Sequence, residues 1–455
     1  MSSLNASLAT ALSGLIADQG AVQTATNNVA NVNTAGYSRQ EPVLVASDPV
    51  VVDPLTFGTG VTLQSVESIR DPLIETQIQQ QTQAQGQYSA LSTALQQTQT
   101  NFSGTTGDIG NSISSFFDSI NQLSANPSDL SLRQGVLTAA GNLATSFNAT
   151  SNNLTQQQSS LDIGVVQDVG QINQLSQQIA QLNAQIANLQ NVGENAGSFI
   201  DTRTQAIDQL SALVDVSVIP SDATLTLTTA NGTPLVTGQQ SFQLQTQTAA
   251  GGLHDVYAQG VDITSQISSG QLGGTLQARD QQIPAIQTQL NTLASGLGNA
   301  VNTVQAAGFD LNGVAGTNLF SGTASAASIS VAITNPSLIA ASSDGSAGSN
   351  GNAEALYALS TAAIAGGGGQ NPIDYYSGVV FNVGNSTANA GAEQSASELV
   401  LQQLNDQRAS ISGVSLDEEA ANLVLYQNAY TASAQVMTAI NDMMYATINM
   451  STLTG

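Results

Sequence analysis

The chain has 455 residues, which is too long for one compact core and predicts about two to four domains. It contains 31 acidic residues against six scattered arginines and no lysine, so it lacks the clustered cations that nucleic acids or anionic membranes require. The absence of cysteine excludes disulfides, thiol catalysis and metal sites built on thiolates.

The N-terminus reads MSSLNASLATALSGLIADQG, without the basic region and unbroken apolar run of a signal peptide. No stretch of the sequence reaches the roughly 18 apolar residues that span a bilayer. We therefore expect neither a cleaved signal peptide nor a membrane-spanning helix.

The first predicted element is a helix over residues 4–32, marked by an apolar residue at every seventh position. These positions are Leu8, Leu15, Val22 and Val29. Asp18 interrupts the companion row of apolar positions. A seven-residue repeat requires a partner helix along one seam. The next segment, 33–67, offers none because it is rich in proline, glycine and β-branched residues.

Three polar helices are predicted next, beginning near Pro72, at 131–191 and at 198–214. Their apolar residues recur at helical spacing on a background of glutamine, asparagine, serine and threonine. Weakly charged faces of this kind suit solvent or polar packing against sister subunits.

The spacing of the apolar residues changes to every second position within residues 216–268, as in a strand. Leu225 and Leu227 alternate there with threonines. The Asn231-Gly232 pair predicts a hairpin with a type I′ turn. We interpret this segment as a small β domain inserted between helices.

Helix is predicted to resume at 275–306. Residues 308–352 are rich in glycine, serine and asparagine, with one short β run at 329–333. Four glycines at 366–369 indicate a loop or linker, and the last central helix is predicted over 386–412.

The final predicted element is a helix over 416–450, again with an apolar residue at every seventh position. These positions are Leu416, Leu423, Tyr430, Met437 and Met444. Ser415 and Glu418 form a capping box at its start. We expect this helix to pair with the N-terminal one, so that both heptad sets form an axial assembly seam. The alternative is two amphipathic helices on separate cores.

The predicted fold is mainly α with an inserted β domain, and it has three parts. A paired coiled-coil stalk would take residues 1–70 and 413–455. A helical middle domain with short β segments would take residues 71–215 and 269–412. A small projecting β domain would take residues 216–268.

The segment that follows the first helix, 27–39, resembles the N-terminal signature of bacterial flagellar rod, hook and junction proteins. The residues that carry the resemblance include Asn31, Asn33, Thr34, Gly36, Tyr37 and Arg39. The segments 412–423 and 426–430 resemble the C-terminal region of the hook-associated protein 1 family. The alternative is another flagellar axial subunit, of the hook or rod type, which the helix-rich middle and the segment 416–422 disfavour.

The resemblance implies a structural subunit that joins the hook of a bacterial flagellum to its filament. It implies an extracellular location after export through the flagellar type III apparatus as an unfolded chain. The implied partners are other copies in a ring at the hook tip, the hook protein, the second hook-associated junction protein and a cytosolic export chaperone. The chaperone would bind the C-terminal region, where Leu423, Tyr430 and Met437 share the apolar face.

Residues that could carry catalysis are few. His254 is the one histidine, and we interpret it as a surface residue of the β domain. The acidic run 417–419 opens a helix, where the helix dipole favours acids, so we do not interpret it as a catalytic pair. The sequence contains no phosphate loop and no nucleophile elbow. We expect no catalytic, cofactor or metal site; the rival interpretation, a cell-wall hydrolase, can be assayed on peptidoglycan.

Overall fold

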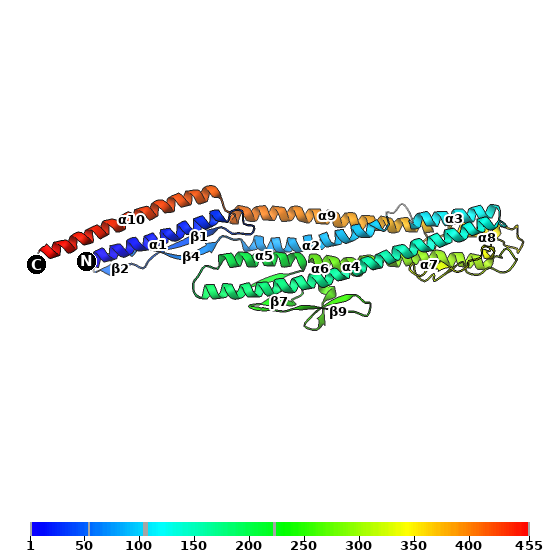
Figure 1. The fold of residues 1–455 in the computed structure, drawn as a ribbon, viewed down its shortest axis with the longest axis horizontal. Helices are drawn as coiled ribbons and strands as arrows, with labels where there is room; N and C mark the ends of the chain where they lie inside the picture. Colours follow the sequence, from blue (N-terminus) through cyan, green and yellow to red (C-terminus); the bar gives the residue numbers. More distant parts are fainter. Residues whose placement is uncertain (1, 53–54, 103–107, 222–223, 454–455) are drawn as a thin grey trace. The chain divides into compact units, whose positions relative to one another are not determined.

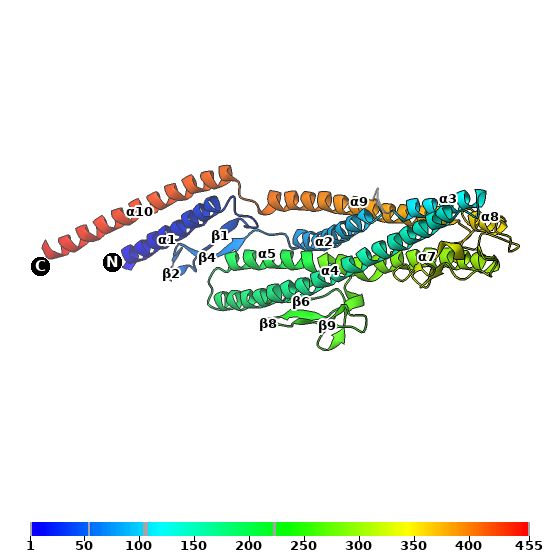
Figure 2. The same cartoon turned by 45° about the vertical axis from the view of Figure 1, so that its right-hand side comes forward.

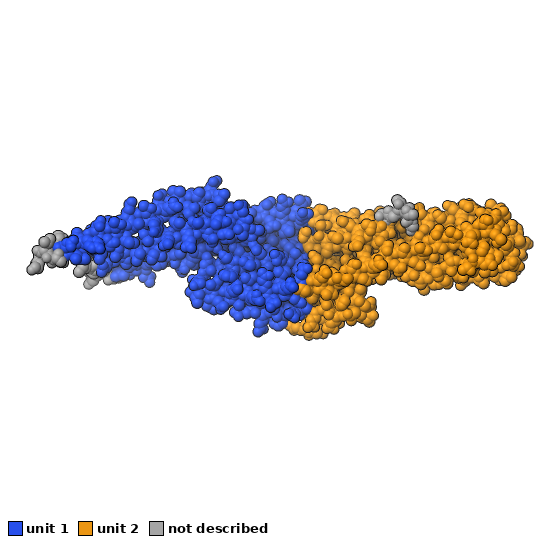
Figure 3. All heavy atoms as spheres, viewed as in Figure 1, with its two compact units in different colours: residues 1–83, 171–244, 397–455 blue, residues 84–170, 245–396 orange. Residues whose placement is uncertain are grey.

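The structure is a computed structural model, which describes residues 2–52, 55–102, 108–221 and 224–453. The chain forms two compact units, distinguished by colour in Figure 3. The first unit comprises residues 1–83, 171–244 and 397–455, and the second comprises residues 84–170 and 245–396. Long helices with a small β portion make up the chain, which confirms the predicted fold class (Figure 1). The predicted division into three domains stays a prediction.

The helices fall into three groups by the unit that contains them. Those of the first unit are α1 (Ser2–Ala30), α5 (Gly197–Leu213) and α10 (Leu416–Leu453). Those of the second are α3 (Ile109–Ala125), α6 (Gly270–Gln277), the π-helical turn Ala278–Gln282, α7 (Ile283–Ala307) and α8 (Gly351–Ala358). Three helices have one part in each unit: α2 (Pro72–Thr100), α4 (Leu130–Asn191) and α9 (Pro372–Ser412).

Most helices lie where the sequence predicted them. The helices α3 and α8 were not predicted, and α9 starts earlier than predicted. The prediction began it at residue 386, whereas the helix begins at Pro372. Asn371 caps it, because its side chain accepts a hydrogen bond from the backbone N–H of Asp374 at 2.9 Å. Asparagine followed by proline is a helix-start signal that the composition of the preceding glycine run obscured.

The strands form small sheets. In the first unit β1 (Gln40–Ala46) pairs with β4 (Val61–Ser68), and β2 (Val50–Val52) pairs with β3 (Leu55–Phe57). A four-stranded sheet has the order β5 (Ser217–Ser221), β6 (Thr224–Thr228), β7 (Pro234–Thr237), β8 (Gln240–Ser241). Another contains β9 (Leu244–Thr248), β10 (His254–Ala258) and β11 (Val261–Asp262), and β12 (Phe320–Ser321) pairs with β13 (Ser330–Val331).

The hairpin between β6 and β7 has a different turn from the one predicted. Gly232 has a φ of +85°, but Asn231 does not have a positive φ, which a type I′ turn requires at both central residues. The N–H of Thr229 donates to the carbonyl of Thr233, and the N–H of Gly232 donates to the carbonyl of Thr229. The turn is therefore longer, with glycine supplying the left-handed residue.

The second unit contains a large apolar core built from α3, α4, α7, α8 and the β12–β13 hairpin. Phe116 is fully buried in this core, with its ring centroid 5.7 Å from that of Phe320. Arg133 is fully buried beside this core, where its guanidinium donates to the carbonyls of Pro127 and Ile339. Main-chain oxygens accept from its Nε and Nη1 and offset part of the cost of burying the charge, whereas Nη2 has no hydrogen-bond partner among the described residues.

Asparagine side chains on the helices dock main chain from elsewhere in the sequence. Asn173 of α4 both donates to the carbonyl and accepts from the N–H of Leu244, each at 2.8 Å. Asn302 of α7 makes the same pair of bonds with Phe320, also at 2.8 Å. An amide side chain has the donor and acceptor of a peptide group, so it can replace a neighbouring strand. Within the described residues, no helix is long and apolar enough to cross a membrane.

Candidate assembly interface

The two ends of the chain pack together as antiparallel helices. Figures 1 and 2 both show α1 beside α10. Leu4 near the start of α1 lines a small cavity with Met444 near the end of α10. Val22, towards the end of α1, lines another with Tyr430. The hydroxyl of Ser433 donates to the carboxylate of Asp18 at 3.1 Å, so the interruption in the heptad row has a polar partner.

The predicted seam residues differ in their burial. Half-buried are Leu8, Leu15, Val22 and Val29 of α1 and Leu423, Met437 and Met444 of α10. Leu416 is 52% exposed and Tyr430 is 39% exposed. The fully buried positions of α1 are small residues instead, among them Ala17 and Ala21, because α1 packs against the β1–β4 sheet as well as α10. The role of the heptad residues in assembly stays a prediction.

The segment after α1 folds back on that helix. The side chain of buried Asn28 donates to the carbonyl of Gln40 at 2.8 Å and accepts from its N–H at 3.0 Å. The hydroxyl of Tyr37 also donates to Asn28 at 2.8 Å. Burial, together with the negative charges of Asp201 and Glu419, raises the pKa of Tyr37 to about 12. We call the signature segment 27–39 the motif. Asn28, which was not among the predicted site residues, therefore fixes the path of the motif into β1.

The remaining motif residues shape the turn. Asn31 donates to the carbonyl of Asn27 at 2.9 Å, and Thr34 donates to the side chain of Asn31 at 3.1 Å. Gly36 has a φ of +74°, and an added Cβ there would lie 2.4 Å from the side chain of Gln205. Asn33 is exposed. Gly36 is thus required both for its backbone conformation and for close contact with α5.

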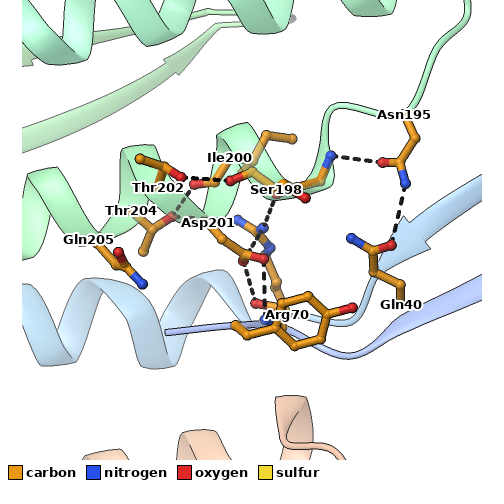
Figure 4. A network of polar contacts seen from close by, with 12 residues as sticks. Gln40, Arg70, Asn195, Ser198, Ile200, Asp201, Thr202, Thr204 and Gln205 are labelled. Atoms are coloured by element: carbon orange, nitrogen blue, oxygen red, sulfur yellow. Dashed lines mark hydrogen bonds and ion pairs between the residues drawn. The ribbon is translucent and has the colours of Figure 1, made fainter. Parts of the chain in front are cut away.

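Asp201 of α5 forms a buried ion pair with Arg70, which follows β4, and also binds Ser38 of the motif (Figure 4). Arg70 contacts Asp201 at 2.5 Å, and their side chains are only 16% and 8% exposed. Ser38 donates to the same carboxylate through its hydroxyl at 2.8 Å and its N–H at 3.3 Å. Burial raises the pKa of Asp201, while Arg70 and Ser38 oppose that shift. Three donors, the guanidinium of Arg70 and the hydroxyl and N–H of Ser38, thus converge on one carboxylate. No sequence signal identified Asp201 or Arg70.

Arg39 connects the motif to the corner between α9 and α10. Its N–H donates to the carbonyl of Ser412 at 2.8 Å, and its guanidinium contacts Glu418 at 2.6 Å and Glu41 at 3.3 Å. Ser415 accepts a bond from the N–H of Glu418 at 3.4 Å, which is one of the two bonds of the predicted capping box. The carboxylate of Glu418, which would make the other bond, contacts Arg39. The same arginine therefore binds the end of α9, the start of α10 and β1.

These contacts surround a cavity of about 520 Å³, which we call the joint cavity. Its lining includes Glu75 of α2, Asp208 of α5 and Arg408 of α9. Arg408 approaches Asp208 only to 3.7 Å. Burial and the neighbouring Glu75 raise the pKa of Asp208 to about 7, against the opposing effects of Arg408 and Gln79. Burial also raises the pKa of Glu75.

His254 lies at the start of β10 in the second unit, and its side chain is 34% exposed. Its Nδ1 lies 2.7 Å from Asp162, which also binds Arg279 at 2.7 Å. Its Nε2 lies 3.3 Å from the hydroxyl of Thr248. Asp162 also accepts the backbone N–H of His254, so the group fastens β10 to α4. Within the described residues, no cluster of acidic and histidine side chains could hold a metal ion.

The paired terminal helices, the Asn-Thr-Ala-Gly-Tyr turn and the β hairpin that follows it define an axial subunit of the bacterial flagellum. Residues 95–320 match the helical domain of flagellar hook-associated protein FlgK. Residues 8–37 match the flagella basal body rod proteins, and residues 406–450 match the C-terminal region of the flagellar basal body rod FlgEFG proteins.

The full-length relatives are more specific. The chain is 30% identical to flagellar hook-associated protein 1 of Bacillus subtilis (strain 168), over 99% of both chains. It is 28% identical to the protein of that name from Escherichia coli (strain K12), over 97% of this chain and 98% of that one. The chain therefore belongs to the family of flagellar hook-associated protein 1.

The fold agrees with this assignment. The structure of the flagellar hook junction protein FlgK from Burkholderia pseudomallei matches with a TM-score of 0.68 and 18% sequence identity, covering 74% of this chain and 100% of that one. The function expected from the resemblance is confirmed: the protein is a structural subunit of the junction between the hook and the filament.

Proposed function

We propose that copies of this chain form a ring at the hook tip, between the hook protein and the second hook-associated junction protein. The chain would reach that position unfolded, through the flagellar export apparatus and without a cleaved signal peptide. Its role would be structural only, without catalysis. The observation that carries the proposal is an apolar stripe on α10 that faces away from α1.

The stripe consists of Leu425, Val436 and Met443, which are 61%, 51% and 51% exposed. Spacings of eleven and seven residues place them on one side of the helix. The three side chains recur along one side of the helix, so they form a row of apolar contacts left in water, which suits an interface with another protein. An antiparallel α1–α10 pair with a second apolar face is suited to packing between neighbouring copies.

We expect Leu425→Asp or Val436→Asp to abolish filament attachment while leaving the fold intact. Both side chains are largely in solvent, so the charge costs little in the monomer but would be buried without a partner in the ring. Thr438→Asp is the matched control, because exposed Thr438 lies about 140° around the helix from Leu425. Microscopy of flagella and the thermal midpoint of the purified proteins are the measurements. Normal filaments on the Leu425 and Val436 variants would remove the stripe from the interface.

We further propose that the cytosolic export chaperone binds Leu423, Tyr430 and Met437 before export. A segment that is unfolded during export can fold first on one partner and later on another. Met437→Asp is expected to weaken chaperone binding and to abolish filament attachment, because half-buried Met437 belongs to the face that both partners would use. Calorimetry with the cognate chaperone measures the first effect, with Thr438→Asp as the control. Unchanged chaperone affinity together with failed assembly would show that the two partners use different faces.

A further inference from the structure

The β1–β4 sheet has one closed edge and one open edge. The N–H of Ile69 donates to the carbonyl of Arg39 at 2.8 Å, so these opposed residues face each other across the sheet. Hydrogen-bonded and non-bonded pairs alternate along antiparallel strands. The register pairs Gln40 with Ser68 and Pro42 with Val66, and both are non-bonded pairs. The main-chain N–H and C=O groups of these residues therefore point away from the partner strand, towards the outer edges of the sheet.

The outer edge of β1 is closed. At Gln40 the side chain of Asn28 binds both the N–H and the carbonyl. Pro42 has no N–H to offer. Proline and side-chain caps of this kind prevent a further strand from pairing with an edge.

The outer edge of β4 opens on a groove of about 580 Å³ within the first unit. Residues 63–68 form one wall, and the turn between α4 and α5, from Gly193 to Gly197, forms the other with Ile200. Figure 2 shows β4 close to the start of α5. Val66 therefore directs a peptide N–H and carbonyl towards a space large enough for an extended chain.

The rim of the groove is acidic. Glu67 and Glu194 line it and are exposed. The one lining cation, Arg70, is committed to Asp201. A strand that carries basic residues would therefore be complementary in charge.

A second copy of this chain cannot provide such a strand. None of its six arginines is free in an extended segment. Arg39 is paired with Glu418, and Arg70 is paired with Asp201. Arg133 and Arg279 are buried, and Arg203 and Arg408 lie in the helices α5 and α9. We infer that an extended, basic segment of a different protein binds in this groove as a third strand beside β4. Three strands also form a more stable sheet than an isolated hairpin does.

The test titrates the purified full-length protein with a fluorescent peptide of sequence TRVTVRT, followed by anisotropy. We expect saturable binding that Val66→Pro weakens about tenfold, the worth of one main-chain hydrogen bond. Because Val66 turns its N–H away from β1, proline at this position spares the existing ladder. Val66→Thr is the matched control and should bind normally. Removing both rim charges with Glu67→Gln and Glu194→Gln should weaken binding and reduce its dependence on salt.

A second measurement does not depend on the fold of any variant. The same peptide, N-methylated at its central residues, keeps its charge but cannot pair with a strand edge, and it should not bind the unaltered protein. Equal binding of the methylated peptide, equal binding to Val66→Pro, or no binding of TRVTVRT would overturn the inference. Self-association in ultracentrifugation that Val66→Pro abolishes would also overturn it, by assigning the groove to a second copy. These assays need no flagellum, so they fail or succeed independently of the ring proposal.

Discussion

Asp201→Ala is expected to lower the free energy of unfolding by about 3–5 kcal/mol, the usual cost of leaving one partner of a buried ion pair alone. Arg70 would remain 16% exposed with its carboxylate gone, and Ser38 would lose the acceptor for its hydroxyl and its N–H. Because Ser38 lies in the motif segment, the loss should also loosen the path from α1 into β1. Urea denaturation followed by circular dichroism measures the change.

Two comparisons show whether the pair is responsible. Asp442→Ala removes an exposed carboxylate from α10 and should change the stability by no more than about 0.5 kcal/mol. Combining Arg70→Ala with Asp201→Ala should cost less than the sum of the two single changes, because no unpaired charge is then buried. If Asp201→Ala alone lowers the free energy of unfolding by less than about 1 kcal/mol, water satisfies Arg70 in the variant. The ion pair then does not hold the motif against α5.

Asp208→Asn is expected to stabilise the protein at pH 8 and to have little effect at pH 4. The pKa of Asp208 is raised to about 7 in the folded chain, against about 3.9 for an unfolded aspartate. The folded state therefore binds the carboxyl proton of Asp208 more tightly than the unfolded state does. The stabilisation that protonated Asp208 contributes is complete below about pH 4 and is lost as the pH rises to about 7. About three units of pKa correspond to about 4 kcal/mol as an upper limit.

The measurement is the free energy of urea unfolding at several pH values between 4 and 8. The unaltered protein should lose stability across this window, and Asp208→Asn should remove much of the slope. Residual slope is expected from Glu75, whose pKa is also raised by burial. Asp442→Asn, which changes an exposed acid, should keep the full slope. A slope that survives intact in Asp208→Asn would show that Asp208 is ionised in the folded chain throughout this range.

Local patterns in the sequence predicted the elements that depend on near neighbours. The seven-residue repeats at both chain ends predicted α1 and α10, because each repeat reports one apolar face of one helix. The capping box at Ser415 predicted the start of α10, since a cap involves residues only three apart. The motif is a continuous segment of the sequence, so it could be recognised without the structure, and it predicted the flagellar family.

What the sequence left open were the roles of polar residues. The asparagines and glutamines of the helices predicted polar faces in contact with solvent or sister subunits. In the structure, buried Asn28 and Asn302 instead bind main chain from elsewhere in the sequence. The sequence does not distinguish a buried amide side chain from a solvated one. Only the position of another main-chain segment in the folded chain decides which of the two it is.

By itself, the sequence determined that the chain is helical, has an apolar seam at each end and belongs among flagellar axial proteins. Only the tertiary structure decided which residues hold the ends to the rest of the first unit. Ser38 meets Asp201 across 163 residues, and Arg39 meets Glu418 across 379. The structure also left Leu416 and Tyr430 exposed, although they share the spacing of half-buried Leu423. Periodicity fixes which side of a helix is apolar, but the partner helix decides how much of that side it covers.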